Sequence, residues 1–208
     1  TPPTDYAKWA RICEHIIRHY TEGWADGFEY KITYWEIWNE PDSKPNPEES
    51  MMWKGEPESY YKFYDVAAKH LKSCFPHLKI GGYAACGFYG IYEEKLAQVE
   101  NHERFVHYVN FFEGFLDYIK KSGAPLDFFS WHCYFRNFER LVEKSKLVRE
   151  LLDRHGYTET ESILNEYNYL ENWTDLFVST IESIIGMRGA AFTSACFAFC
   201  PATIYNSA

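Results

Sequence analysis

The chain has 208 residues, of which 46% are hydrophobic and 25% charged, and its formal net charge is −9. This composition is typical of a globular protein, and the acidic balance argues against a nucleic-acid partner because phosphate backbones would be repelled. No apolar run approaches the roughly 18 residues of a membrane-spanning helix, so a membrane partner is not expected either.

The first half of the chain alternates between helical and strand patterns. Residues 5–20 carry apolar side chains at helical spacing. The aromatic and β-branched run 32–38 predicts a buried strand. After a loop rich in Pro and Glu, Pro57 suits the first turn of a helix whose apolar stripe continues to Leu71. Residues 79–84 then predict a short strand.

The second half repeats this alternation. The same patterns predict, in order, a helix over 105–121, a strand over 126–134, a helix over 138–155, a strand over 162–166 and a helix over 176–185. The Ala-rich run 189–200 is compatible with helix or strand, and we favour helix. Residues 203–205 could begin a last strand.

These elements predict a parallel sheet in an α/β fold. Strand ends fall near residues 40, 85, 134 and 166, and each gap is long enough for a crossover helix. No G-x-G-x-x-G motif and no phosphate-binding loop are present, so a doubly wound nucleotide-binding sheet is less favoured than a (β/α)8 TIM barrel. A complete barrel needs roughly 250 residues. The sequence therefore predicts an incomplete barrel in a single domain, residues 1–208, with about strands 4 to 8 present and the first strands missing.

Neither the cysteines nor the histidines predict a metal or cofactor. The six cysteines form no C-x-x-C pair, and most of them lie in apolar periodic segments, where a thiol behaves as a small hydrophobe. This usage slightly favours a reducing compartment such as the cytoplasm. His15 and His19 are four residues apart on a predicted helix, but the Glu of a zinc-protease helix and a third ligand are missing from this pattern.

Two glutamates stand at the ends of predicted strands. Glu40 is followed by Pro41, which cannot continue a ladder of hydrogen bonds, and Glu166 ends the strand 162–166. Barrel enzymes keep their chemistry at this end of the strands. Two carboxyl groups placed there are what glycoside hydrolysis needs, whereas the alternative is a solvated Glu in an exposed turn.

Several motifs resemble known glycosidases. Trp38-Asn39-Glu40-Pro41 resembles the acid/base strand of the clan of retaining glycosidases built on (β/α)8 barrels. The stretches 53–64, 79–82, 130–134 and 165–168 resemble glycoside hydrolase family 39, which includes β-xylosidases and α-L-iduronidases. The resemblance covers most of residues 5–208. It departs from the family at Tyr83, where Pro is usual, and at Asn165 and Tyr167, where Thr and Trp are common.

The resemblance implies a retaining, metal-free hydrolysis without cofactors. Glu40 would be the acid/base and Glu166 the nucleophile, with carboxyl groups roughly 5–5.5 Å apart. Asn39 would bind the 2-hydroxyl of the sugar, or else simply form a turn. Tyr134 would hydrogen-bond the nucleophile, and His132 would line the sugar site, although interior polar groups of this kind are often structural.

Trp53 lies in the long loop after the first strand. Loops at this face of a barrel shape the substrate site. Its ring would stack on a second sugar of the substrate, and the equally weighted alternative is burial against its own loop.

We therefore expect an exo-acting glycosidase that cleaves O-glycosidic bonds of an oligosaccharide or glycoside, most like a β-xylosidase. The alternative from another class is a carbohydrate-binding or structural relative in which catalysis has lapsed. Because the first strands are expected to be missing, residues 1–208 alone should have little or no activity, and an oligomer formed at the open edge is compatible with this prediction.

Overall fold

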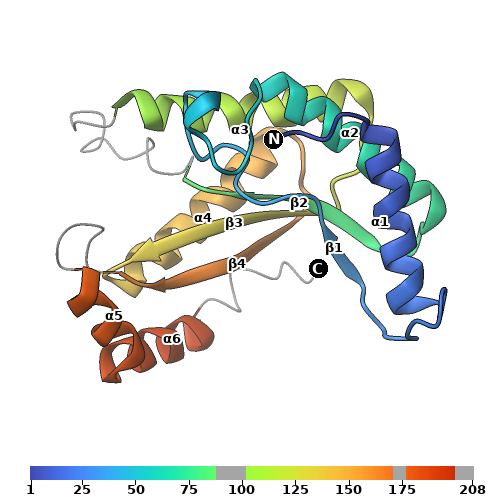
Figure 1. Cartoon of the computed structure of the whole chain (residues 1–208). Coiled ribbons are helices and arrows are strands. Elements are labelled where there is room, and N and C mark those ends of the chain that lie inside the picture. The colour runs from blue at the N-terminus through green and yellow to red at the C-terminus, as the bar shows by residue number, and fades with distance from the viewer. Residues whose placement is uncertain (88–101, 171–176, 200–208) are drawn as a thin grey trace. The chain divides into compact units, whose positions relative to one another are not determined.

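The computed structural model describes residues 1–87, 102–170 and 177–199 (Figure 1). The chain divides into two compact units, residues 1–129 and 130–208. Within the described ranges, no helix combines the length and the apolar character that crossing a membrane requires.

The first unit contains three long helices and the strands that they precede. Its elements are α1 (Tyr6–Thr21), β1 (Tyr34–Glu36), the 3-10 helix η1 (Pro47–Glu49), α2 (Pro57–Cys74), β2 (Lys79–Ala85), α3 (His102–Ser122) and the first residues of β3 (Phe128–Phe135). β1 pairs with β2 in parallel, with Trp35 opposite Ile80. The predicted parallel arrangement is confirmed for this pair.

The second unit begins within β3. It continues with α4 (Phe138–Arg154), β4 (Glu161–Tyr169), α5 (Phe177–Ile185) and α6 (Met187–Phe199). α6 packs against α4 and β4, and its helical conformation confirms the choice made for the Ala-rich run. The possible last strand at 203–205 lies outside the described residues. Along the sheet the strands are hydrogen-bonded in chain order, β1-β2-β3-β4.

Local signals explain where the helices begin. The Asp5 side chain accepts a hydrogen bond from the backbone N–H of Lys8, 2.8 Å away, and so caps α1. Pro57 occupies the first position of α2, where its missing N–H leaves no hydrogen bond unmade. The Asn137 side chain caps α4 by accepting from the N–H of Glu139 at 2.9 Å.

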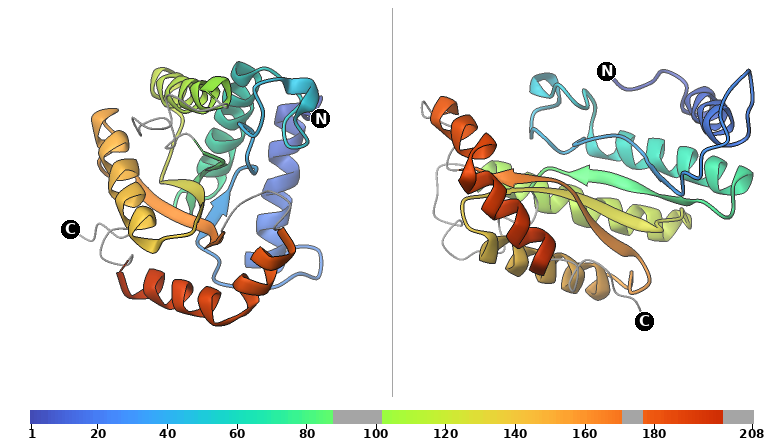
Figure 2. Two further views of the ribbon diagram at one scale, coloured as in Figure 1. Left: turned by 90° about the vertical axis from the view of Figure 1, so that its left-hand side faces the viewer. Right: turned by 90° about the horizontal axis from the view of Figure 1, so that it is seen from below.

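An aromatic core holds the first unit together. α2 lies between α1 and α3 (Figure 2) and also packs against β2. The aromatic rings of Tyr60, Tyr83 and Phe111 meet within 6 Å of one another. The Tyr60 hydroxyl donates to the carbonyl of Ile37 at 2.9 Å, so this buried phenol is paired. The core therefore fixes the backbone directly after β1 as well as the helices.

β1 is shorter than the predicted strand 32–38. Regular strand geometry ends at Glu36, although the N–H of Ile37 still donates to the carbonyl of Gly81 at 2.9 Å. Trp38 then takes φ = +74°, which no strand residue adopts. The aromatic and β-branched composition did indicate an extended run, but it carries no signal for this turn in the backbone.

A close approach at Gly81 sets the spacing of the strands. A Cβ atom added to Gly81 would overlap the carbonyl oxygen of Phe128 at the start of β3. Only a residue without a side chain fits at this point of β2.

Gly81→Ala should therefore destabilise the protein by about 1–3 kcal/mol, because the overlapping atom belongs to backbone that cannot move aside. Urea unfolding followed by circular dichroism would measure this loss. Gly123→Ala is the control, since a Cβ there meets nothing within 4 Å and only its left-handed backbone costs about 1 kcal/mol. A smaller loss for Gly81→Ala than for Gly123→Ala would contradict the packing argument.

Candidate active site

The backbone around Glu40 is held in an unusual conformation. Trp38 has φ = +74° and Glu40 has φ = +46°, both in the left-handed region that L residues rarely adopt. Such conformations cost roughly 1–3 kcal/mol each and persist where the surroundings impose them. Here the N–H of Glu40 donates to the carbonyl of Ala84 at 3.2 Å, and Ala84 itself has φ = +57°. The strain is concentrated at the residue predicted to be the acid/base.

A buried carboxylate two residues later secures the same turn. Asp42 is 0% exposed, and its two oxygens accept the backbone N–H of Cys86, each at 3.1 Å. This contact ties the segment after β1 to the residue that follows β2. Sequence reasoning missed Asp42, although its position two residues after Glu40 in Asn-Glu-Pro-Asp was a signal.

The electrostatics near Glu40 exclude Cys86 as a nucleophile. Burial raises the pKa of the Cys86 thiol to about 12, and the negative charges of Asp42 and Glu40 act in the same direction. The thiol therefore stays protonated at neutral pH.

The Trp53 side chain is buried. Its side chain is 1% exposed, and its ring packs edge-on against Trp38, with centroids 5.2 Å apart. Its indole N–H donates to the Ser59 hydroxyl at 3.0 Å. The structure thus matches the alternative of burial in the loop, and the stacking role is corrected accordingly. Trp38 anchors the same loop by donating from Nε1 to the carbonyl of Met52 at 3.1 Å.

We call Glu40 and the contacts around it the first half-site, because it holds one of the two predicted carboxylates. The second half-site surrounds Glu166 on β4, in the second unit. The Tyr134 hydroxyl, from β3, donates to Glu166 Oε1 at 2.7 Å. His132 Nδ1 lies 3.5 Å from the same oxygen. The His132 side chain is 2% exposed, whereas that of Glu166 is 45% exposed. A rigid, buried strand thus presents two polar groups to one oxygen of a carboxylate that solvent can reach, and these contacts orient the carboxylate.

The opposite side of these strands is fixed separately. Trp131, which alternates with His132 along β3, is fully buried and donates from Nε1 to the Ser162 hydroxyl on β4 at 3.1 Å. Alternation along the strand explains why Trp131 fills the core while its neighbours His132 and Tyr134 do not share that side. The registration of β3 against β4 therefore sets the place of Tyr134 relative to Glu166.

The predicted residues fall into two groups by unit. Glu40 and the exposed Asn39 belong to the first unit, and Glu166, His132 and Tyr134 belong to the second. Each half-site is defined within its own unit, and the 5–6 Å separation of the two carboxyl groups stays a prediction.

Helices alternate with strands in both units, Glu40 follows β1, and Glu166 lies within β4, which continues to Tyr169 and so extends beyond the predicted end at residue 166. This arrangement is typical of barrel glycosidases. The chain belongs to glycosyl hydrolases family 39, whose profile matches residues 1–172. A β-xylosidase of Geobacillus stearothermophilus is 29% identical over 188 residues, which are 81% of this chain and 32% of that protein. A β-xylosidase of Caldicellulosiruptor saccharolyticus is 30% identical over 134 residues, which are 64% of this chain and 22% of that protein.

Solved structures give the same class of fold. A glucosidase from Croceicoccus marinus superposes with a TM-score of 0.69 at 30% identity, over 93% of this chain and 35% of that one. A GH39 β-xylosidase from Caulobacter crescentus has a TM-score of 0.56 at 20% identity, over 88% of this chain and 37% of that one. The chain has a TIM-barrel-like glycosidase fold and spans between 22% and 37% of the length of these proteins.

Asp42 provides a test of the first half-site. Asp42→Ala should destabilise the protein by about 1–3 kcal/mol, because the buried N–H of Cys86 loses its acceptor. Asp42→Asn keeps one acceptor oxygen and should cost less. Urea unfolding of both variants measures the difference, and equal stability of Asp42→Ala and the unaltered protein would show that the contact does not secure the turn.

Proposed function

We propose that the complete natural polypeptide is a retaining glycosidase in which Glu40 is the acid/base and Glu166 the nucleophile. The single observation that carries this proposal is the Glu166 carboxylate, which Tyr134 and His132 contact at one oxygen while the side chain remains open to solvent. A solvated glutamate in an ordinary turn would not be positioned by two side chains of the neighbouring strand, β3.

In the first step, a Glu166 oxygen attacks the anomeric carbon of the sugar. The glycosidic C–O bond breaks, its electron pair goes to the departing oxygen, and Glu40 donates a proton to that oxygen. The product is a covalent glycosyl ester on Glu166 and a free alcohol. The hydrogen bond from Tyr134 holds the attacking carboxylate before this step, and Asn39 is proposed to bind the 2-hydroxyl of the sugar.

In the second step, Glu40 acts as a base. It removes a proton from water as the water oxygen attacks the anomeric carbon, and the bond to Glu166 breaks to restore the carboxylate. Two displacements at one carbon retain its configuration. This scheme requires carboxyl groups roughly 5–5.5 Å apart, whereas a separation of roughly 6.5–9.5 Å would favour inversion.

The proposed substrate class is a β-xyloside. The enzyme would release xylose from the end of a sugar chain or from an aryl or alkyl aglycone. It rests on the two relatives that are named β-xylosidases, each of which this chain matches at 29–30% identity. A similar solved structure is a glucosidase, so aryl glucosides belong in the same assay.

The second candidate is a carbohydrate-binding relative without catalysis. The presence of both glutamates favours the enzyme. Release of phenol from an aryl β-xyloside by the complete polypeptide separates the two candidates, because a binding protein releases none.

Glu166→Ala in the complete polypeptide should abolish turnover of every substrate, since no covalent intermediate can form. Added azide should restore cleavage of an activated aryl xyloside and yield a glycosyl azide of inverted configuration. Glu166→Asp is a matched control that keeps the charge at a longer distance and should retain some activity. Full activity of Glu166→Ala without azide would remove this residue from the mechanism.

Glu40→Ala should reduce turnover most for poor leaving groups. An activated nitrophenyl group leaves without protonation, whereas an alkyl alcohol needs the proton that Glu40 supplies. The measurement is kcat/KM for a series of xylosides whose leaving groups differ in pKa, compared with the unaltered enzyme. An equal loss across the series would contradict the assignment of Glu40 as the acid.

A further inference from the structure

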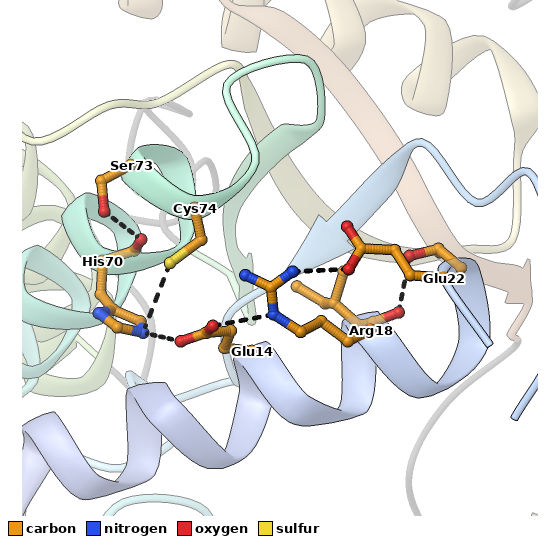
Figure 3. A network of polar contacts seen from close by, with 8 residues as sticks. Glu14, Arg18, Glu22, His70, Ser73 and Cys74 are labelled. Atoms are coloured by element: carbon orange, nitrogen blue, oxygen red, sulfur yellow. Dashed lines mark hydrogen bonds and ion pairs between the residues drawn. The ribbon is translucent and has the colours of Figure 1, made fainter. Parts of the chain in front are cut away.

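Three side chains of the types that bind metals meet between α1 and α2 in the first unit, away from Glu40 (Figure 3). Glu14 on α1 meets His70 and Cys74, which face it from one side of α2 at i, i+4 spacing. Glu14 Oε2 lies 2.7 Å from His70 Nε2, and Cys74 Sγ lies 3.8 Å from the same nitrogen. One ligand atom from each of the three residues lies within 4.8 Å of the other two.

The arrangement does not suit a nucleophilic triad. In such a triad, one ring nitrogen of the histidine accepts the proton of the nucleophile while the other nitrogen donates to the carboxylate. Here the thiol and the carboxylate both approach Nε2, so the ring cannot connect them. Three ligand atoms that lie this close together instead suit a metal ion placed between them.

We propose that Glu14, His70 and Cys74 bind a zinc ion, with water completing a tetrahedral site. Zn–S, Zn–N and Zn–O bonds of about 2.3, 2.0–2.1 and 2.0–2.2 Å give tetrahedral edges of about 3.6 Å from S to N and about 3.4 Å from N to O. The sulfur and nitrogen atoms are already near that separation. Glu14 Oε2, now 2.7 Å from His70 Nε2, would have to move away from that nitrogen by about 0.7 Å to reach the N–O edge.

The surroundings hold Glu14 in the orientation that this site requires. Arg18 Nε donates to Glu14 Oε1 at 2.9 Å, which directs the other oxygen, Oε2, toward His70. Arg18 in turn pairs with Glu22 at 2.6 Å, so part of its positive charge is neutralised. Outer partners of this kind orient the ligands in metal sites.

The ligand set selects the kind of metal. A thiolate and an imidazole favour zinc and similar transition metals over magnesium or calcium, which prefer oxygen ligands. The side chains of Glu14 and His70 are 17% and 30% exposed, so an ion can enter from solvent.

The position in the fold indicates what the ion would do. His70 and Cys74 lie in the last turns of α2, just before β2 begins, whereas Glu40 contacts Ala84 at the other end of β2. The proposed site is therefore remote from the Glu40 half-site. A bound ion would join α1 to α2 and stabilise their packing.

Isothermal titration of the untagged, metal-free protein with Zn²⁺, in the presence of a phosphine reductant, would test the proposal. We expect one saturable site per chain, and titration with Co²⁺ should produce a thiolate-to-metal charge-transfer absorption. Cys74→Ser should abolish that absorption and weaken Zn²⁺ binding by about tenfold or more, and Glu14→Gln and His70→Ala should weaken it similarly. Cys13→Ser and His77→Ala are matched controls that remove a thiol or an imidazole outside the cluster and should bind as the unaltered protein does.

A second measurement keeps the test decisive if a variant folds poorly. Zn²⁺ should raise the melting temperature of the unaltered protein and of Cys13→Ser, and should raise that of Cys74→Ser by less at the same concentration. Serine is nearly isosteric with the natural cysteine. Absence of one-to-one binding, or binding and absorption unchanged in Cys74→Ser, would overturn the proposal. Neither result depends on glycosidase activity, so this inference can fail while the proposed function holds.

Discussion

The turn that follows β1 depends on a short series of contacts to β2. Ile37 donates to Gly81, Glu40 donates to Ala84, and Asp42 accepts from Cys86. These contacts advance along both segments together, so the parallel register continues beyond the last regular strand residue. They hold Glu40 in a left-handed conformation that an unsupported chain would leave. The polar group proposed for proton transfer is thus placed by main-chain bonds and does not depend on a mobile loop.

The aromatic core also holds the backbone of this turn. Tyr60 is fully buried and reaches the carbonyl of Ile37 with its hydroxyl, so a core side chain bonds the backbone of the turn. Trp38 and Trp53 then fasten the long loop over the same core. Because packed interiors resist deformation, a substitution in this core would also displace the backbone that carries Glu40.

In the second half-site, side-chain contacts between β3 and β4 hold the polar residues. Strand alternation separates the two sides of β3, since Trp131 is buried in the core while Tyr134, three residues later, reaches Glu166. A hydrogen bond between Trp131 and Ser162 fixes β3 against β4 on the other side. In each unit, then, a tryptophan near the polar residues packs into the interior: Trp38 lies two residues before Glu40, and Trp131 lies next to His132.

Local sequence determined much of the fold and singled out the two glutamates. Apolar spacing placed the helices within a few residues, because one face of each helix must be buried. Pro41 predicted a strand that continues up to Glu40, whereas β1 already ends at Glu36. Only the tertiary structure decided which side chains meet. Trp53 turned inward because the aromatic residues of α2 offered it a place, and the Tyr134 contact to Glu166 joins residues 32 apart. Glu14 and His70, 56 residues apart, meet because α1 packs on α2, and no local pattern records which helix faces will touch.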